Sequence, residues 1–341
     1  MKHPRGSLLI TAAVAAVTGG ALATAPAASA ATPAPALAPA PALAPAPALA
    51  AASADGYASL SGGTTGGAGG STVTVSSLSA LQTAAKASGK STIQISGTIS
   101  LSGQVDITSD KTVVGVGANS GLTGGGLRVK NANNVIIRNL KISKAKGTDA
   151  ITIQQSTHVW VDHNDLSSDM NNGKDYYDGL VDITHAADYV TVSWNRLHDH
   201  YKVSLVGHSD SNASEDTGHL RVTYHHNYFY NFNTRGPSLR FGTGHFYNNY
   251  YSNGSGAIHT RMNAQGLAQN NVFRSVSTPI ETTGDSPTDG YINQSGNDFG
   301  GGTNDITRTG SFTNPPYSFS LDATSSVISN VQSNSGTGKV S

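Results

Sequence analysis

VTVSWNRL (Val190–Leu197) and VTYHHNYF (Val222–Phe229) each place an asparagine directly after a short alternating run of apolar residues. This pattern decides the fold, because it recurs along most of the chain. VIIRNL (Val135–Leu140) and VWVDHNDL (Val159–Leu166) are strong copies, and weaker copies follow toward the C-terminus. The marker asparagines are Asn139, Asn164, Asn195, Asn227, Asn249, Asn271 and Asn297.

The marker asparagines lie 25, 31, 32, 22, 22 and 26 residues apart. A minimum near 22 with irregular additions is typical of solenoid coils that carry loop insertions. One coil cannot bury its apolar face alone, but stacked coils can. Asparagine tolerates the left-handed backbone at a bend, and stacked asparagines form hydrogen-bonded ladders. The sequence therefore predicts an all-β fold, a right-handed parallel β-helix. A β-propeller is the alternative, but its blades need roughly 40–50 residues each.

A helix is expected before the coils, over Ser76–Ser88. Leu78, Leu81 and Ala85 recur at helical spacing, and Ser77 is a suitable N-cap. Because the end repeats of a solenoid must be covered, this helix is predicted to cap the N-terminal end of the stack.

The chain divides into three parts by composition. Residues 1–30 combine Lys2 and Arg5, an apolar run and a small-residue site at Ala28–Ala30, which is the layout of a secretory signal peptide. A membrane anchor is the alternative, but the apolar run is short for spanning a bilayer. Residues 31–54 are an Ala/Pro-rich linker, and 55–341 form one large domain. We expect a secreted, extracellular protein with no membrane attachment after cleavage.

Composition excludes several kinds of site. The chain has no cysteine, so thiolate metal sites and cysteine nucleophiles are excluded. The formal net charge is zero, so no overall basic field indicates binding to nucleic acid.

Three aspartates form the candidate metal site. Asp149 begins the strand-like run DAITI. Asp178 and Asp182 lie four residues apart in the stretch DYYDGLVDI. Adjacent coils would bring the three together, and grouped carboxylates suit Ca²⁺. Solvated turn aspartates are the alternative interpretation.

A basic set lies in the following coils. Lys202 comes seven residues after Asn195, and Arg235 comes eight after Asn227, so the solenoid register places them on one face. Arg240 follows in NTRGPSLR (Asn233–Arg240). Isolated surface charge is the alternative, but cations near the aspartates would suit an anionic ligand. The numerous histidines lack zinc-site spacing, and we interpret most as stacked or hydrogen-bonded structural residues.

Five motifs follow one another along the chain: VWVDH, DGLVDI, VTVSWN with Lys202 downstream, TYHHNYF and RGPSLR. With these motifs in this order, the chain from about Gly56 to near Asn330 resembles the secreted pectate lyases of the first polysaccharide lyase family. The resemblance implies a parallel β-helix and calcium-dependent cleavage of polygalacturonate, an acidic polysaccharide, by β-elimination. It places Asp149, Asp178 and Asp182 at calcium-ligand positions, Lys202 and Arg240 at substrate-carboxylate contacts, and Arg235 at the position of the base. Gly147 stands where some members carry a further aspartate.

An arginine base implies an alkaline optimum, because a guanidinium rarely loses its proton in water. The alternatives are a pectin lyase acting on methyl-esterified chains, a galacturonan hydrolase, and a non-catalytic β-helix that binds polysaccharide. A hydrolase would need paired carboxylates as acid and base. We expect the protein to act as a monomer.

Overall fold

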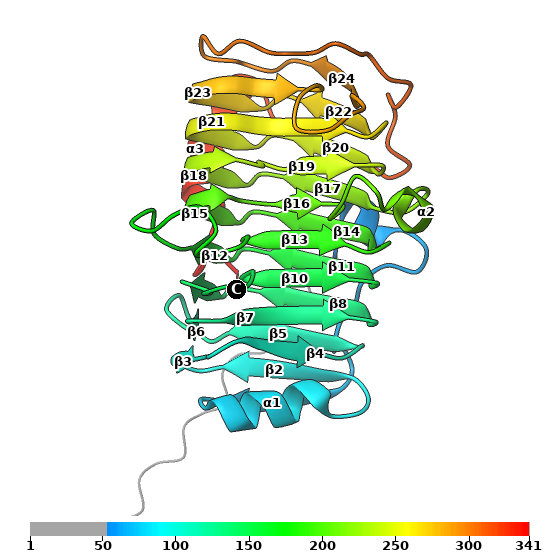
Figure 1. Ribbon diagram of the computed structural model, residues 1–341. Coiled ribbons are helices and arrows are strands. Elements are labelled where there is room, and N and C mark those ends of the chain that lie inside the picture. The colour runs from blue at the N-terminus through cyan, green and yellow to red at the C-terminus, as the bar shows by residue number, and fades with distance from the viewer. Residues whose placement is uncertain (1–52, 341) are drawn as a thin grey trace, which may run out of the picture. The chain divides into compact units, whose positions relative to one another are not determined.

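The computed structural model describes residues 53–340. The predicted signal peptide (1–30) and most of the predicted linker (31–54) lie outside these residues. Within them the chain winds into a stack of coils in which every ladder between named strands is parallel (Figure 1). Each strand pairs with the equivalent strand of the coil before and the coil after it. The predicted right-handed parallel β-helix is confirmed.

The coils present three faces. The first face is a ten-stranded sheet. Its strands are β1 (Ser71–Val75), β2 (Ser91–Ile95), β5 (Lys111–Gly115), β8 (Asn133–Arg138), β11 (Thr157–Asp162), β14 (Asp188–Ser193), β17 (Arg221–His225), β20 (Thr243–Tyr247), β22 (Gln265–Gln269) and β24 (Tyr291–Ser295).

The second and third faces belong to one fourteen-stranded sheet that is continuous through the long strand β21. The second face holds β3 (Thr98–Ser100), β6 (Gly121–Thr123), β9 (Lys141–Ser143), β12 (Asp165–Ser167), β15 (Arg196–Lys202), β18 (Tyr228–Thr234), β21 (Tyr250–Arg261) and β23 (Val272–Glu281). The third face holds β4 (Gln104–Ile107), β7 (Gly126–Lys130), β10 (Ile151–Gln154), β13 (Val181–Thr184), β16 (Leu205–Val206) and β19 (Ser238–Arg240), followed by the second half of β21.

An asparagine ladder stabilises the bend between the first and second faces. Each ladder side chain before the last one, Asn297, donates from Nδ2 to Oδ1 of the asparagine in the next coil, at 3.0 Å between Asn195 and Asn227. Each Nδ2 also donates to a backbone carbonyl of the preceding coil, as Asn227 does to Val192. The ladder comprises Asn164, Asn195, Asn227, Asn249, Asn271 and Asn297.

The expectation for Asn139 was wrong. The amide N–H of Leu140, not of Asn139, donates to Asn164, so Leu140 occupies the ladder register in the coil of β8 and β9. Asn139 instead has φ of 56°, like His163 and Trp194 in later coils. The left-handed residue of the bend is therefore the one before each ladder asparagine, and the ladder asparagines themselves are not left-handed.

The predicted capping helix is α1 (Leu78–Lys86), and Ser77 is its N-cap, accepting a hydrogen bond from the Ala80 amide. Its buried residues Leu81, Ala84 and Ala85 close the apolar interior at the N-terminal end. The interior itself is continuous along the stack and includes a column of stacked rings, from Phe229 through Tyr251 to Phe273.

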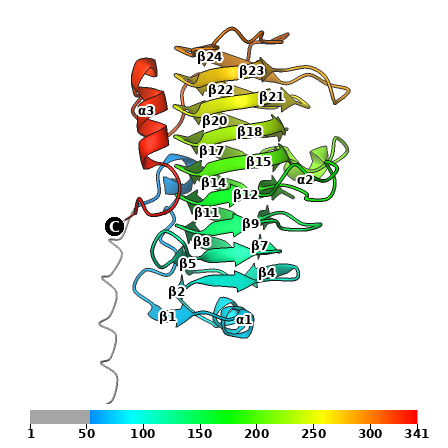
Figure 2. The same cartoon turned by 90° about the vertical axis from the view of Figure 1, so that its left-hand side faces the viewer.

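Two terminal segments run along the outside of the stack. The N-terminal strap (residues 53–70, including the 3₁₀ turn Gly56–Ser59) crosses the first face. Gly56, with φ of 58°, is required where the strap meets β14, because a Cβ there would lie 2.7 Å from the Thr191 hydroxyl. At the other end, α3 (Thr324–Asn334) lies alongside the coils and packs Val327 and Val331 on the second face (Figure 2). No helix within residues 53–340 has the length and apolar character needed to cross a bilayer.

Candidate active site

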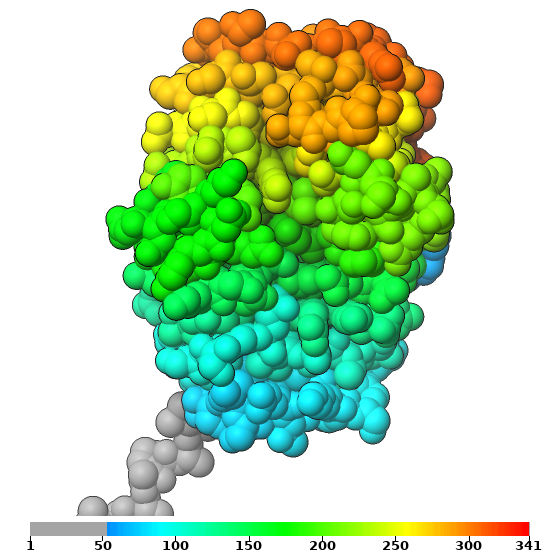
Figure 3. Space-filling model, in the orientation of Figure 1, coloured from blue at the N-terminus to red at the C-terminus, as the bar shows by residue number. Residues whose placement is uncertain are grey.

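The predicted site residues gather on the third face and at its border with the second face, where Lys202 ends β15 and Arg235 follows β18. Two long loops flank the third face, residues 168–180 before β13 and residues 207–220 after β16, the latter containing the short helix α2 (Ala213–Asp216). The surface is hollowed between the lobes that these loops form (Figure 3). Long polar insertions on a rigid solenoid are where such folds carry function.

Two of the three aspartates are buried side by side. Asp149 precedes β10, Asp182 lies within β13, and these strands are paired neighbours. Asp149 accepts hydrogen bonds from the Thr152 hydroxyl and from the Gly179 amide, at 2.6 and 2.9 Å. Asp182 accepts one from the Leu205 amide at 3.0 Å. These bonds fix both carboxylates in place.

The carboxylates of Asp149 and Asp182 converge on Gly179. A Cβ at Gly179 would lie 2.4 Å from Asp182 Oδ1 and 3.0 Å from Asp149 Oδ1, so only glycine fits. Burial, and then repulsion from Asp178, raises the pKa of Asp149 to about 6. Burial and the charge of Asp149 raise the pKa of Asp182. Two buried carboxylates that repel each other form a pair that a cation would stabilise.

The Asp178 carboxylate contacts the ammonium group of Lys202 and does not join Asp149 and Asp182. Its Oδ1 lies 3.3 Å from Lys202 Nζ, and Lys202 also contacts Asp175 at 2.9 Å. Burial lowers the pKa of Lys202, but the contacts with Asp175 and Asp178 outweigh burial and raise it. In residues 53–340 no three His, Cys, Asp or Glu side chains are close enough together to hold a metal ion.

The basic residues lie one coil further along. Lys202 pairs with Thr234, the residue before Arg235, so Lys202 and Arg235 lie in adjacent coils. Arg235 has φ of 65° and directly follows β18. Within the described part of the chain its guanidinium makes no hydrogen bond or ion pair, while its charge acts on Asp175 and Asp182. The Arg235 guanidinium is therefore a basic group of the site that is not paired with a carboxylate of the described residues.

Arg240 is held by residues that sequence analysis missed. It is buried, forms an ion pair with Asp210 through Nε, and donates from Nη1 to the Gly207 carbonyl at 2.7 Å. Arg261 follows Arg240 in register on the adjacent strand, where burial and then the charge of Arg240 lower the pKa of Arg261 to about 10. Its position about one coil after Arg240 was the signal that could have identified it.

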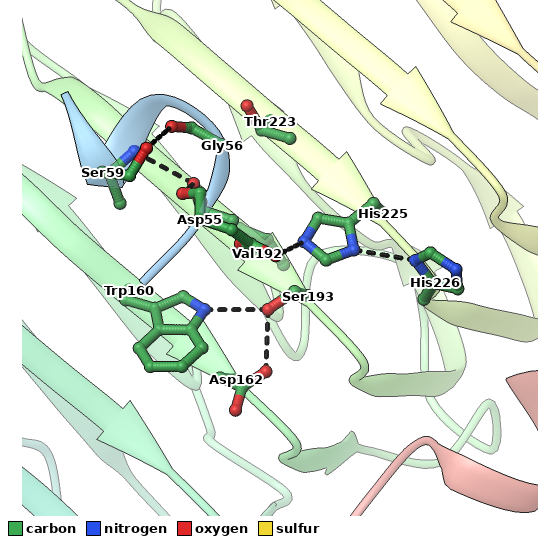
Figure 4. Close-up of polar contacts among 12 residues, drawn as sticks. Asp55, Gly56, Ser59, Trp160, Asp162, Val192, Ser193, Thr223, His225 and His226 are labelled. Carbon is green, nitrogen blue, oxygen red and sulfur yellow. Dashed lines mark hydrogen bonds and ion pairs between the residues drawn. The ribbon is translucent and has the colours of Figure 1, made fainter. Parts of the chain in front are cut away.

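The histidines have the structural roles that were expected. His226 stacks on Trp194 at 4.2 Å, and His198 stacks on Tyr230 at 4.4 Å. On the first face, His225 lies between Asp55 of the N-terminal strap and His226, with nitrogen to oxygen and nitrogen to nitrogen distances of 2.9 and 2.8 Å (Figure 4). This cluster belongs to the outside of the first face, whereas the predicted site residues belong to the third face and its border with the second.

Comparisons with known proteins agree with this geometry. A family model described as pectate lyase matches residues 8–340. The probable pectate lyase A of Neosartorya fischeri is 52% identical over 279 residues, which are 81% of this chain and 85% of that protein. The pectate lyase of Bacillus sp. N165, solved in complex with trigalacturonate, is 36% identical with a TM-score of 0.77, covering 84% of this chain and 99% of that one. Another solved pectate lyase, studied for its substrate specificity and anti β-elimination mechanism, is 26% identical with a TM-score of 0.73, covering 84% of this chain and 97% of that one.

The family match and the similarity to the relative from Neosartorya fischeri both extend over most of the chain. The conserved architecture extends over the coils that carry the aspartates and the basic residues. The chain therefore belongs to the pectate lyase family of polysaccharide lyases.

Proposed function

We propose that this protein is a calcium-dependent pectate lyase that cleaves de-esterified polygalacturonate by β-elimination. The observation that carries the proposal is the meeting of two kinds of charge on the third face. The charges of Lys202 and Arg235 act on two buried, mutually repelling carboxylates, Asp149 and Asp182. Arg240 lies on β19, two strands further along the same face than Asp182. Such a face can bind a polyanion through guanidinium groups on one side and through a bridging cation on the other.

The donor set fits calcium. Asp149, Asp178 and Asp182 offer only carboxylate oxygens, which hard cations such as Ca²⁺ prefer. The convergence of Asp149 and Asp182 on Gly179 leaves a cradle that a Cβ would fill. We assign Asp149, Asp178 and Asp182 as the residues that would hold the ion. Asp149 and Asp182 already converge, whereas Asp178 contacts Lys202 and would have to turn from that lysine to join them. Bound calcium would supply positive charge that neutralises the substrate carboxylate next to the acidic C5 proton.

Arg235 is the proposed base. After losing one guanidinium proton to solvent at alkaline pH, it would take the C5 proton, the electron pair of that C–H bond would form the C4–C5 double bond, and the C4–O4 bond would break. The leaving O4 would take a proton from water, and the product would be a 4,5-unsaturated galacturonate end. Lys202 and Arg240 would bind substrate carboxylates and stabilise the negative charge that develops on them. Support for this route comes from the relative that is described as acting by anti β-elimination.

The substrate class is proposed from the charge of the site and from the trigalacturonate held by the relative from Bacillus sp. N165. Trigalacturonate carries one carboxylate on each sugar, so it suits a face lined by Lys202, Arg235 and Arg240. We also propose that the protein is secreted, because pectic polysaccharides are extracellular, and that it acts as a monomer.

The first test is the ultraviolet absorbance of the unsaturated product. Polygalacturonate at alkaline pH should give rising absorbance with added calcium, and excess chelator should abolish the rise because the substrate carboxylates lose their counter-ion. A rise that persists with chelator and prefers methyl-esterified pectin would favour a pectin lyase. New reducing ends without absorbance would indicate a hydrolase, and binding without cleavage would indicate a non-catalytic β-helix.

A further inference from the structure

The Arg240 guanidinium is fixed on part of its surface and free on the rest. Nε faces Asp210 and Nη1 donates to the Gly207 carbonyl at 2.7 Å. A guanidinium has five N–H donors in a rigid plane. Nη2 of Arg240 has no hydrogen-bond partner among residues 53–340, so the edge that includes Nη2 is free to receive a carboxylate.

Asp210 is itself fixed by a second contact. The Ser286 hydroxyl donates to Asp210 Oδ1 at 2.8 Å, although the two residues lie on loops far apart in sequence. Arg261 donates to the Ser286 hydroxyl and to the Asp285 carbonyl, both at 3.3 Å. A chain of polar contacts therefore joins Arg240, Asp210, Ser286 and Arg261, and it connects the loop after β16 with the loop after β23.

Charge explains why a carboxylate is needed at this position. Arg240 and Arg261 lie in register on adjacent strands, which are about 4.8 Å apart, so their charges repel. The Asp210 carboxylate contacts Arg240 directly and is linked to Arg261 through the Ser286 hydroxyl. Burial raises the pKa of Asp210, but its bonds with Arg240 and Ser286 outweigh burial and lower it, so Asp210 stays ionised at neutral pH.

We propose that Asp210 is a positioning residue, which orients the Arg240 guanidinium so that its free edge binds a substrate carboxylate. The inference rests on the proposed function, because it takes Arg240 as a substrate contact. Asp210 occupies Nε of Arg240 and leaves Nη2 unbonded, and Nη2 is accessible to solvent. A substrate carboxylate can therefore meet Nη2 without displacing Asp210.

The test compares kcat and KM of Asp210→Ala and Asp210→Asn with those of the wild-type protein on polygalacturonate. Loss of a charge-assisted hydrogen bond removes about 1.5–3 kcal/mol, so Asp210→Ala should raise KM about tenfold or more. Asp210→Asn keeps an acceptor oxygen and should give a smaller rise. We expect kcat to change by less than about threefold, because Asp210 does not touch the reacting atoms.

Ser286→Ala is the second variant, and it serves if Asp210→Ala does not fold. Removal of its hydroxyl should raise KM by a smaller factor than Asp210→Ala does. Asp298→Asn is the matched control, because Asp298 forms an exposed ion pair with Arg274 at 2.6 Å outside the site. Its KM should equal that of the wild type.

The outcomes separate the two proposals. A wild-type protein that does not cleave polygalacturonate would overturn the proposed function. An active wild type whose KM is unchanged in both Asp210→Ala and Ser286→Ala would overturn the role of Asp210 and leave the proposed function standing. A fall in kcat at constant KM would also contradict the positioning role.

Discussion

Arg235 is the first residue after β18, where the chain turns out of the strand. Its φ of 65° takes the chain out of β18 and toward β19, and its guanidinium is left without a protein partner in the described residues. Non-glycine residues in this region cost free energy unless the surroundings hold them there. The backbone of Arg235 is held because its carbonyl accepts a hydrogen bond from the Ser204 amide at 2.8 Å.

Replacement of this side chain tests the proposed base. Arg235→Lys keeps a positive charge but shortens its reach and removes the planar donor group. We expect turnover of polygalacturonate to fall by at least about 10²-fold, while the melting temperature stays within a few degrees of the wild type. Initial rates and a thermal melt measure the two effects. A variant that keeps the wild-type rate would exclude Arg235 as the base.

For single residues, the sequence predicted which coil a side chain lies in better than which side chains it contacts. Counting from the marker asparagines placed Lys202 and Arg235 in adjacent coils, and the ladder between β15 and β18 confirms it. Asp175 and Asp210 were not predicted, because both lie in loops whose course does not follow from the coil register. Which carboxylate an arginine meets in such a loop is a property of the folded chain.

The asparagine ladder is the element that repeats in nearly every coil of the central stack. Every member except the half-buried Asn297 is buried and uses both Nδ2 and Oδ1, so its polar groups are satisfied without water. Polar groups in an interior are tolerated only in this fully bonded state. The ladder thus fixes the axial register of neighbouring coils.

Removal of one ladder member should destabilise the fold. Asn227→Ala removes the acceptor of the Asn195 amide N–H and side chain, and also the donor to the Val192 carbonyl. Buried groups left without partners cost about 1–3 kcal/mol each, so we expect a loss of at least about 3 kcal/mol in the free energy of unfolding. Denaturant unfolding measures it. Asn172→Ala, at an exposed loop position, is the control and should stay within about 0.5 kcal/mol of the wild type.

The element scale also shows where sequence patterns mislead. The helix at Ser76–Ser88 was predicted because spacing and N-cap agree, and α1 begins one residue after the predicted cap. Asn139 was misassigned because asparagine suits both positions of the bend, the left-handed residue and the ladder residue. Only the hydrogen bond from the Leu140 amide to Asn164 distinguishes them.

Across the whole molecule, buried histidines link stability to pH. Burial lowers the pKa of His226 to about 4 and that of His245 to about 3. An unfolded histidine has a pKa near 6.5. Above that pH both states are neutral, so these residues contribute no pH dependence. Below it the unfolded chain takes up protons that the folded chain rejects, so stability falls as the pH falls.

The free energy of unfolding should therefore decrease between about pH 6.5 and pH 4. Each of the two histidines can contribute up to about 3 kcal/mol at the acid end of that range. Urea unfolding at a series of pH values measures the slope. His245→Gln, which cannot take up a proton, should make the slope shallower. A slope equal to that of the wild type would show that His245 does not cause the acid sensitivity.

The N-terminal strap and the C-terminal segment determine how the stack of coils unfolds. A solenoid in which each coil touches only its neighbours can open from one end, coil by coil. The N-terminal strap bonds in turn to Thr223, Thr191 and Thr112, on β17, β14 and β5. On the C-terminal side, Asp322 contacts His226, and Gly338 donates to Asn139. Fraying of a central coil therefore breaks bonds to segments anchored several coils away, and the free energy of many coils is lost together. The straps turn a one-dimensional array into a single cooperative unit, whose unfolding is all-or-none.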